Sequence, residues 1–338
     1  MQHDTRLPVI AIPMGDPNGI GPEIVIKALA DPQVFAWCRP LVVGDAYCLG
    51  KTLAALDLPL YLHTINTVAD ARFQPGFIDL LDLSHEGLEN LQIGTVQDLA
   101  GQCAMDYIER TVALAASGEA TAIATTPINK ESLRAAGVPH IGHTEILASL
   151  TGTDDPLTLF ETNGLRVFFL SRHVSLRQAC DLVTRDKVAK MIRRCCASLQ
   201  QLGVLDKELA VAGLNPHSGE HGLFGDEELT AVGPAVADCQ AEGLPVVGPV
   251  SADSVFHMTR IGRFSGVLSL YHDQGHIATK TLDFERTISL TLGLPFLRTS
   301  VDHGTALDIA GQGIASAVSM LEAIRLAAKY APLYRPLT

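Results

Sequence analysis

Three histidines stand at the ends of three apolar, strand-like segments. The segment VFFLSRH ends in His173, AVAGLNPH ends in His217, and VLSLYH ends in His272. Open α/β sheets present their ligands at the carboxyl ends of strands, and neutral imidazole binds zinc and related divalent ions. Any one of the three is more simply an ordinary loop histidine in a chain with twelve. Because they share one placement, we predict that they bind one divalent ion, with Asp273 and Glu220 as hydrogen-bond partners of the ligands.

A second group of residues can bind an anion. His143 and Thr144 open a predicted helical stretch at Ile146–Leu150, where backbone N–H groups favour negative charge. Lys280 and Arg298 flank a strand-like segment and can pair with a phosphate or a carboxylate. The simpler alternatives are an N-cap by Thr144 and two solvated surface cations.

Two glycine-rich loops invite comparison with nucleotide-binding motifs. Gly15–Gly21 follows a predicted strand and precedes a helix, but it fits neither GxGxxG nor GxxxxGK[ST]. Gly311–Ser316 comes nearer to GxGxxG, yet it lacks the last glycine and follows no strand directly. A conventional dinucleotide-binding site is therefore disfavoured, and NAD would have to bind in another way.

Other histidines lie in no comparable context. We expect His3, His63, His85 and His257 to be solvated or simply packed. His276 follows His272 closely, and the sequence leaves open whether it touches the same site.

Strand-like and helix-like segments alternate along the chain, which predicts an α/β fold with mostly parallel strands. The predicted strands are Val9–Met14, Leu41–Val43, Ile78–Leu83, Ala122–Thr125, Leu157–Phe160, Arg166–Leu170, Leu209–Ala212, Val267–Leu270 and Ile288–Leu292. The predicted helices are Pro22–Ala30, Val96–Ala116, Lys187–Leu202, Asp226–Ala241 and Ile314–Tyr330. No repeat or linker divides the chain, so we expect interleaved lobes.

Composition narrows the class of protein. The 338 residues exceed what one core usually supports, and 47% of them are hydrophobic. A net charge of −12 argues against nucleic acids and acidic membrane surfaces as partners. Seven cysteines without a CxxC pair indicate reduced thiols, and neither a signal peptide nor a membrane-spanning segment is evident. We therefore expect a cytoplasmic protein.

Several long motifs together resemble the 4-hydroxythreonine-4-phosphate dehydrogenase family. In the family's order they are IAIPMGDPNGIGPEI, TTPINKESL, GHTEILASLTG, GLNPHSGE, YHDQGH, LGLPFLRTSVDHGTA and HGTALDIAGQGIA. The last is also similar to the adenosine-binding loop of isopropylmalate and isocitrate dehydrogenases, which binds NAD without a GxGxxG motif.

The resemblance implies a fold and a set of site residues. It implies two interleaved α/β/α lobes of the isocitrate and isopropylmalate dehydrogenase type, with the active site in the cleft between them. The cofactor-side lobe would be 1–128 plus 293–338, and the metal- and substrate-binding, dimer-forming lobe would be 129–292. It also implies a homodimer with shared active sites. The implied residues are His173, His217 and His272 for the metal, His143, Thr144, Lys280 and Arg298 for the substrate, and His303, Gly304, Thr305, Asp308 and Gly311 for the cofactor.

One departure concerns the substrate. The family usually has an asparagine contact where this chain has Ser289, which reaches less far and offers fewer hydrogen bonds. The stretches GLFGDEE and YHDQGHI look more like paralogues acting on D-threonate or D-erythronate 4-phosphate than like the enzymes of pyridoxine biosynthesis.

The implied reaction is oxidation of a secondary alcohol by NAD, or NADP, followed by decarboxylation of the β-keto acid. One divalent metal (Zn, Mg, Co or Mn) would assist it. Lys280, Asp253 and Asp273 are candidates for the general base. The alternatives are a dehydrogenase of unphosphorylated aromatic cis-dihydrodiols and a phosphate acyltransferase of the same general fold.

Overall fold

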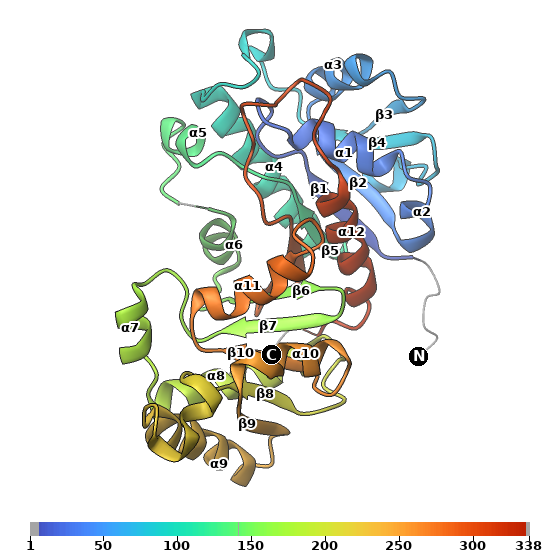
Figure 1. The fold of residues 1–338 in the computed structure, drawn as a ribbon. Coiled ribbons are helices and arrows are strands. Elements are labelled where there is room, and N and C mark those ends of the chain that lie inside the picture. Colours follow the sequence, from blue (N-terminus) through green and yellow to red (C-terminus); the bar gives the residue numbers. More distant parts are fainter. Residues whose placement is uncertain (1–6, 141, 336–338) are drawn as a thin grey trace. The chain divides into compact units, whose positions relative to one another are not determined.

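The computed structural model describes residues 7–140 and 142–335. Their contacts divide the chain into two compact units. Unit 1 comprises the described residues up to Pro156 together with Gly293–Pro332, and unit 2 comprises Leu157–Leu292 with residues 333–335. In Figure 1, unit 1 holds the elements from blue β1 to green α6 and red α12, and unit 2 holds the elements from green β6 to orange α11.

Unit 1 contains a parallel sheet whose strands are largely apolar. Their order is β3 (Tyr61–Ile65), β4 (Phe77–Asp82), β2 (Arg39–Gly44), β1 (Val9–Pro13), β5 (Ala122–Thr125) and β12 (Leu297–Ser300). The central strands β1 and β5 are buried along their whole length, as expected where helices cover both faces of a parallel sheet.

The helices of unit 1 pack against this sheet and against one another. They are α1 (Gly21–Leu29), α2 (Val34–Trp37), α3 (Ala46–Leu56), α4 (Asp98–Ala116), α5 (Lys130–Ala135), α6 (His143–Thr151) and α12 (Val318–Tyr330), with short 3-10 turns η1 (Val68–Asp70) and η2 (Leu88–Asn90). Ile108 of α4, Leu133 of α5 and Leu147 of α6 belong to one buried apolar cluster.

Unit 2 contains a mixed sheet in the order β11 (Ile288–Leu292), β6 (Leu157–Thr162), β7 (Leu165–Phe169), β10 (Gly266–Ser269), β8 (Leu209–Ala212) and β9 (Val246–Val250). β6 is antiparallel to β11 and β7, while β7, β10, β8 and β9 run parallel. The helices are α7 (Leu176–Asp181), α8 (Arg185–Gln201), α9 (Gly233–Ala241), α10 (Ala252–Arg260) and α11 (His272–Leu282), with η3 (Pro216–Gly222) and a π-helical turn η4 (Glu228–Val232).

The predicted α/β class, its mostly parallel strands and all nine predicted strands are confirmed. β3, β9 and β12 were not predicted, and β9 was hidden by Gly248 and Pro249, which are typical of turns. The helix predicted from Ile314 begins only at Val318, because α1 holds the preceding loop: Glu23 accepts from the N–H of Ala315 at 2.7 Å.

The boundary between the compact units also differs from that of the predicted lobes. It falls after Pro156 instead of after residue 128, because α5 and α6 share the apolar cluster of α4. Residues 1–6 and 336–338 of the predicted first lobe lie outside the described residues. The roles assigned to the lobes stay a prediction.

Candidate functional site

The three predicted metal ligands follow three neighbouring parallel strands of unit 2. His173 follows β7, His272 follows β10, and His217 follows β8, and the three strands are adjacent in the order β7-β10-β8. Parallel neighbours end at the same edge of a sheet, which is where α/β proteins place ligands. The predicted placement at strand ends is therefore confirmed.

His173 and His272 line one cavity. Its volume is about 440 Å³, and the two imidazole rings lie 6.1 Å apart between centroids. His272 is the first residue of α11, and its Nδ1 lies 2.7 Å from Oδ1 of Asp273. Because a carboxylate only accepts hydrogen bonds, Nδ1 carries the proton and the lone pair of His272 lies on Nε2. Asp273 thus fixes the tautomer in which Nε2 can bind a metal.

His217 lies on an unusual turn of unit 2. Residues 217–221 all have positive φ angles, a left-handed conformation that costs free energy for every residue other than glycine. The buried carboxylate of Glu228 supports the turn, since it accepts from the N–H groups of Leu214 and Asn215 at 2.7 Å each. His217 lines a second cavity of about 490 Å³ with His221. Strain of this kind is typical of functional sites.

The other candidates of unit 2 are spread over three elements. Lys280 is a half-buried residue in the last turn of α11, with Nζ 5.4 Å from the ring centroid of Phe284. Asp253 is exposed in the first turn of α10, and Ser289 is buried in β11. Asp273 lines the first cavity together with His173 and His272. The structure does not distinguish among Lys280, Asp253 and Asp273 as the general base.

Unit 1 contains a buried cation beside a neutral imidazole. Arg298 on β12 is 5% exposed, and its Nε donates to Oγ1 of Thr125 at 2.9 Å. Burial lowers the pKa of its guanidinium to about 9, although Asp302 and Glu145 act in the opposite direction.

His143 begins α6, with Gly142 as the N-cap. Burial, and then the charge of Arg298, hold the pKa of His143 well below its usual range. Its Nε2 is buried and has no hydrogen-bond partner among the described residues. Thr144 lies inside the first turn, so the alternative interpretation of Thr144 as N-cap is wrong. A ligand at this helix start would satisfy the unpaired Nε2 of His143.

The predicted cofactor loop borders a third cavity, within unit 1. Gly311, Gln312 and Gly313 line it opposite residues of α3 and of the segment around η2, and its volume is about 220 Å³. Gly311 has φ = 75°, and a Cβ there would lie 3.0 Å from Cγ2 of Ile93. Lys27 of α1 holds the loop by donating to the carbonyl oxygens of Gly313 and Ala315 at 2.9 and 2.8 Å.

The remaining loop residues lie on the same segment. Thr305 is buried, and its carbonyl accepts from the N–H of Ile20 at 3.0 Å, which ties the loop to the glycine-rich turn after β1. A Cβ on Gly19 would lie 2.8 Å from Cβ of Thr305, so the turn needs glycine there. His303, Gly304 and Asp308 lie nearer the surface.

Residues 36–327 match the family model described as "Pyridoxal phosphate biosynthetic protein PdxA". The chain belongs to this family. A protein from Clostridium botulinum named "Putative D-threonate 4-phosphate dehydrogenase" is 58% identical over 97% of the chain and 98% of its own length. The resemblance seen in the sequence is thereby confirmed.

Solved structures agree with this assignment. The 4-hydroxythreonine-4-phosphate dehydrogenase of Klebsiella pneumoniae is 44% identical, with a TM-score of 0.89 over 96% of this chain and 99% of that one. A terephthalate 1,2-cis-dihydrodiol dehydrogenase of Burkholderia xenovorans is 29% identical, with a TM-score of 0.66 over 96% and 98%. Among the described residues of this PdxA-family chain, no helix is long and apolar enough to cross a membrane.

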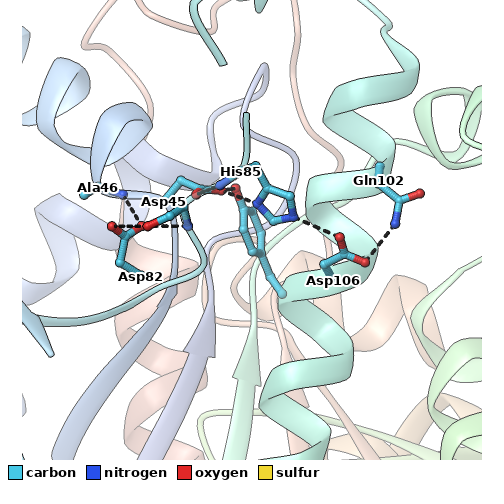
Figure 2. A network of polar contacts seen from close by, with 8 residues as sticks. Asp45, Ala46, Asp82, His85, Gln102 and Asp106 are labelled. Atoms are coloured by element: carbon cyan, nitrogen blue, oxygen red, sulfur yellow. Dashed lines mark hydrogen bonds and ion pairs between the residues drawn. The ribbon is translucent and has the colours of Figure 1, made fainter. Parts of the chain in front are cut away.

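Sequence reasoning missed a buried polar cluster of unit 1. His85 contacts Asp45 and Asp106, each at 2.8 Å, and Figure 2 shows it between the two carboxylates. His63 likewise lies 2.7 Å from the buried carboxylate of Asp79. The expectation that His63 and His85 are merely solvated or packed is therefore wrong. The sequence signal for this cluster is VVGD, in which Asp45 directly follows an apolar strand.

Proposed function

We propose that this PdxA-family protein is an NAD-dependent, divalent-metal-assisted dehydrogenase of a 4-phosphorylated hydroxy acid, of the D-threonate 4-phosphate class. The name and 58% identity of the Clostridium relative support this substrate class. Oxidation of the secondary alcohol is followed by decarboxylation of the β-keto acid. The enzyme acts in the cytoplasm, where its seven free cysteines stay reduced.

The observation that carries the proposal is the anion seat formed by Arg298 and His143. A protein with a net charge of −12 has no long-range attraction for an anion, so a local group of donors must bind it, and Nε2 of His143 is buried without a hydrogen-bond partner among the described residues. Arg298 would contribute positive charge to a phosphate, and His143 Nε2 and the first N–H groups of α6 would contribute further contacts. Thr144 adds a hydroxyl. Lys280 and Ser289 of unit 2 are further proposed substrate contacts.

His173, His217 and His272 are the proposed metal ligands. The fit rests on their donor type, on their common strand edge, and on Asp273, which directs the lone pair of His272 to Nε2. A divalent ion held by these histidines would supply Lewis-acid chemistry, which lowers the pKa of an alcohol and offsets negative charge on oxygen. Since His217 lines a cavity separate from that of His173 and His272, we propose that a homodimer completes each ligand set across its interface.

The unit 1 cavity is the proposed seat of the adenosine end of NAD. Gly311 and Gly313 leave room for a close approach, and Lys27 fixes the loop that carries them. His303, Gly304, Thr305 and Asp308 are the further proposed cofactor contacts. Proton removal from the substrate falls to Lys280, Asp253 or Asp273, and Asp273 is the one that is already bonded to a proposed metal ligand.

The decisive experiment compares D-threonate 4-phosphate with unphosphorylated D-threonate, by absorbance at 340 nm with NAD and a divalent metal. We expect turnover of the phosphate ester only. Arg298→Gln should lower kcat/KM by about tenfold to a hundredfold, the worth of one charge-assisted hydrogen bond. A matched control is Arg286→Gln, which removes an exposed arginine paired with Asp283 on the surface of unit 2. Equal turnover of both acids by the wild type would refute the phosphate seat.

The alternative of a cis-dihydrodiol dehydrogenase is less well supported. The relative of that name is 29% identical, against 44% and 58% for the phosphate-named relatives. An unphosphorylated, aromatic substrate would also leave the buried Nε2 of His143 without a phosphate oxygen to contact.

A further inference from the structure

His85 of unit 1 lies between two carboxylates. Its Nδ1 is 2.8 Å from Oδ2 of Asp45, and its Nε2 is 2.8 Å from Oδ2 of Asp106 (Figure 2). Ionised carboxylates only accept hydrogen bonds, so both ring nitrogens must carry protons for both contacts to form. The geometry is therefore that of an imidazolium held by two charge-assisted hydrogen bonds.

The two carboxylates come from different elements. Asp45 is fully buried between the end of β2 and the start of α3, and it also accepts from the backbone N–H of His85 at 2.9 Å and from the hydroxyl of Tyr107. Asp106 and Tyr107 lie on α4, and Gln102, one turn earlier, donates to Asp106 at 2.8 Å. His85 itself belongs to the segment that follows β4. One side chain thus joins this segment to α3 and to α4.

Two of the elements that His85 joins, α3 and the segment after β4, form walls of the unit 1 cavity. The far end of the segment is fixed separately, since the N–H of Gly94 donates to the carbonyl of Asn18 at 2.8 Å. Ile93 lies against the loop at Gly311, because a Cβ on Gly311 would lie 3.0 Å from Cγ2 of Ile93. The cavity residues carried by α3 and by the segment are Tyr47, Cys48, Lys51, Thr52, Ala55 and Leu56, and Leu88, Leu91 and Ile93 respectively.

We propose that His85 is a positioning residue for the dinucleotide: by bridging Asp45 and Asp106 it holds the segment from residue 83 to residue 94 where Leu88, Leu91 and Ile93 complete the cavity wall. This inference rests on the proposed function, in which the cavity binds the adenosine end of NAD. His85 does not touch the reacting atoms, so it acts through the wall and not on the chemistry.

The charges around His85 set how this anchor responds to pH. The other ionisable groups that act on this cluster are Asp16, Lys51, Asp82, Tyr107, Cys48 and Cys103. Burial lowers the pKa of His85, but the hydrogen bonds and charges of Asp106 and Asp45 outweigh it and raise the pKa above 6.5. When pH rises through that raised pKa, one nitrogen loses its proton and faces a carboxylate with a lone pair. The anchor then loosens.

A metal could compete with the proton at this place. Ligand atoms of Asp45, His85 and Cys103 all lie within 4.8 Å of one another. Both ring nitrogens and Asp45 already have protein partners at hydrogen-bond distance, and burial raises the pKa of the Cys103 thiol to about 12, which keeps it protonated. These contacts favour the proton, and a bound metal is one outcome of the test.

The test compares His85→Gln with His63→Gln. His63 is a matched control, because it also pairs with a buried aspartate of unit 1, on β3, but does not line the cavity. For each variant we would measure kcat, the KM of NAD and of D-threonate 4-phosphate, the Kd of AMP by calorimetry, and amide hydrogen exchange of residues 83–94.

In His85→Gln we expect the KM of NAD and the Kd of AMP to rise about tenfold, because the wall is in place for a smaller fraction of the time. The kcat at saturating NAD and the KM of the acid should stay unchanged, and exchange in 83–94 should quicken. The wild-type KM of NAD should rise with pH above the raised pKa, and His85→Gln should lose that rise. His63→Gln should show none of these effects.

Three results would overturn the inference. The first is an unchanged KM of NAD in His85→Gln, and the second is an equal loss of kcat in both variants, which would mean general destabilisation. The third is a metal ion that the wild type and His217→Ala retain and that His85→Gln lacks. This result would mean that His85 binds a metal ion and is not held as a protonated imidazolium. If the wild type binds neither NAD nor AMP, the proposed function fails first, and the exchange data show separately whether His85 holds the segment.

Discussion

His143 and His85 have opposite pKa shifts, because their neighbours have opposite charges. His143 is buried beside the Arg298 guanidinium, so its pKa is lowered, whereas Asp106 and Asp45 raise the pKa of His85. The first imidazole is thus kept neutral, and the second is favoured as a cation. The charge of its surroundings decides which form each histidine takes.

These shifts predict how stability changes with pH. The unfolded chain binds a proton at His143 near pH 6.5 but the folded chain does not, so stability should fall as pH drops from about 6.5 toward the lower folded pKa. For His85 the sign is reversed: its contribution is complete below about pH 6.5 and is lost as pH rises through the raised folded pKa. Urea midpoints between pH 5 and 9 check both. His143→Gln should flatten the acid side and His85→Gln the basic side, and unchanged profiles would contradict these assignments.

The metal assignment makes a prediction at His217. His217→Ala should lose bound metal and turnover while keeping its far-ultraviolet circular dichroism, because one of three ligands is gone. His221→Ala is the control, since it lies in the same left-handed turn and lines the same cavity but is not a predicted ligand. The metal content of each variant is measured by mass spectrometry after dialysis. Full metal occupancy in His217→Ala would contradict the assignment of His173, His217 and His272 as metal ligands.

At the scale of elements, close backbone approaches decide which helices meet. A Cβ on Gly101 of α4 would lie 2.0 Å from the carbonyl oxygen of Ser132 in α5, so only glycine allows this packing. A Cβ on Gly50 of α3 would meet nothing within 4 Å. The two helical glycines therefore have different reasons to be there, which the sequence alone does not reveal.

Alanine substitutions at these glycines should act in opposite directions. Gly101→Ala should destabilise the protein by about 1–3 kcal/mol, since the backbones of α4 and α5 must separate. Gly50→Ala should stabilise it by about 0.5–1 kcal/mol, because alanine loses less conformational entropy in a helix. Urea unfolding at one pH measures both. A neutral Gly101→Ala would contradict the close packing of α4 on α5.

At the scale of the whole molecule, the candidate residues are divided between two compact units. Arg298, His143 and the cofactor loop lie in unit 1, and the three histidines, Lys280 and Ser289 lie in unit 2. His217 lines a different cavity from His173 and His272. The homodimer with shared active sites that we propose is consistent with this division.

Sharing of active sites can be tested by complementation. Arg298→Gln should be mixed in turn with His173→Ala, His217→Ala and His272→Ala. Random exchange of subunits makes half of the dimers mixed. If Arg298 and the histidine reach one active site from different subunits, each mixed dimer has one site in which both residues are native. Activity should then recover to about a quarter of the wild-type value. Sedimentation should show a dimer, and an active monomer or no recovery in any pairing would refute a shared site.

The sequence by itself determined the features that depend on residues close together along the chain. Apolar runs specified the strands, the placement of His173, His217 and His272 marked their ends, and HGTALDIAGQGIA marked the loop that we propose binds the cofactor. These signals are local, because strand and turn preferences act over a few residues. Family membership followed from the order of such motifs and is confirmed.

Only the tertiary structure decided which of these residues meet. That β7, β10 and β8 are neighbours, that Arg298 is buried beside His143, and that His85 bridges Asp45 and Asp106 are all consequences of the chain's path. Burial and long-range pairing change the charge state of a side chain without leaving a local pattern in the sequence. For that reason His85 passed for an ordinary histidine in the sequence, although its two carboxylate partners make it an anchor of unit 1.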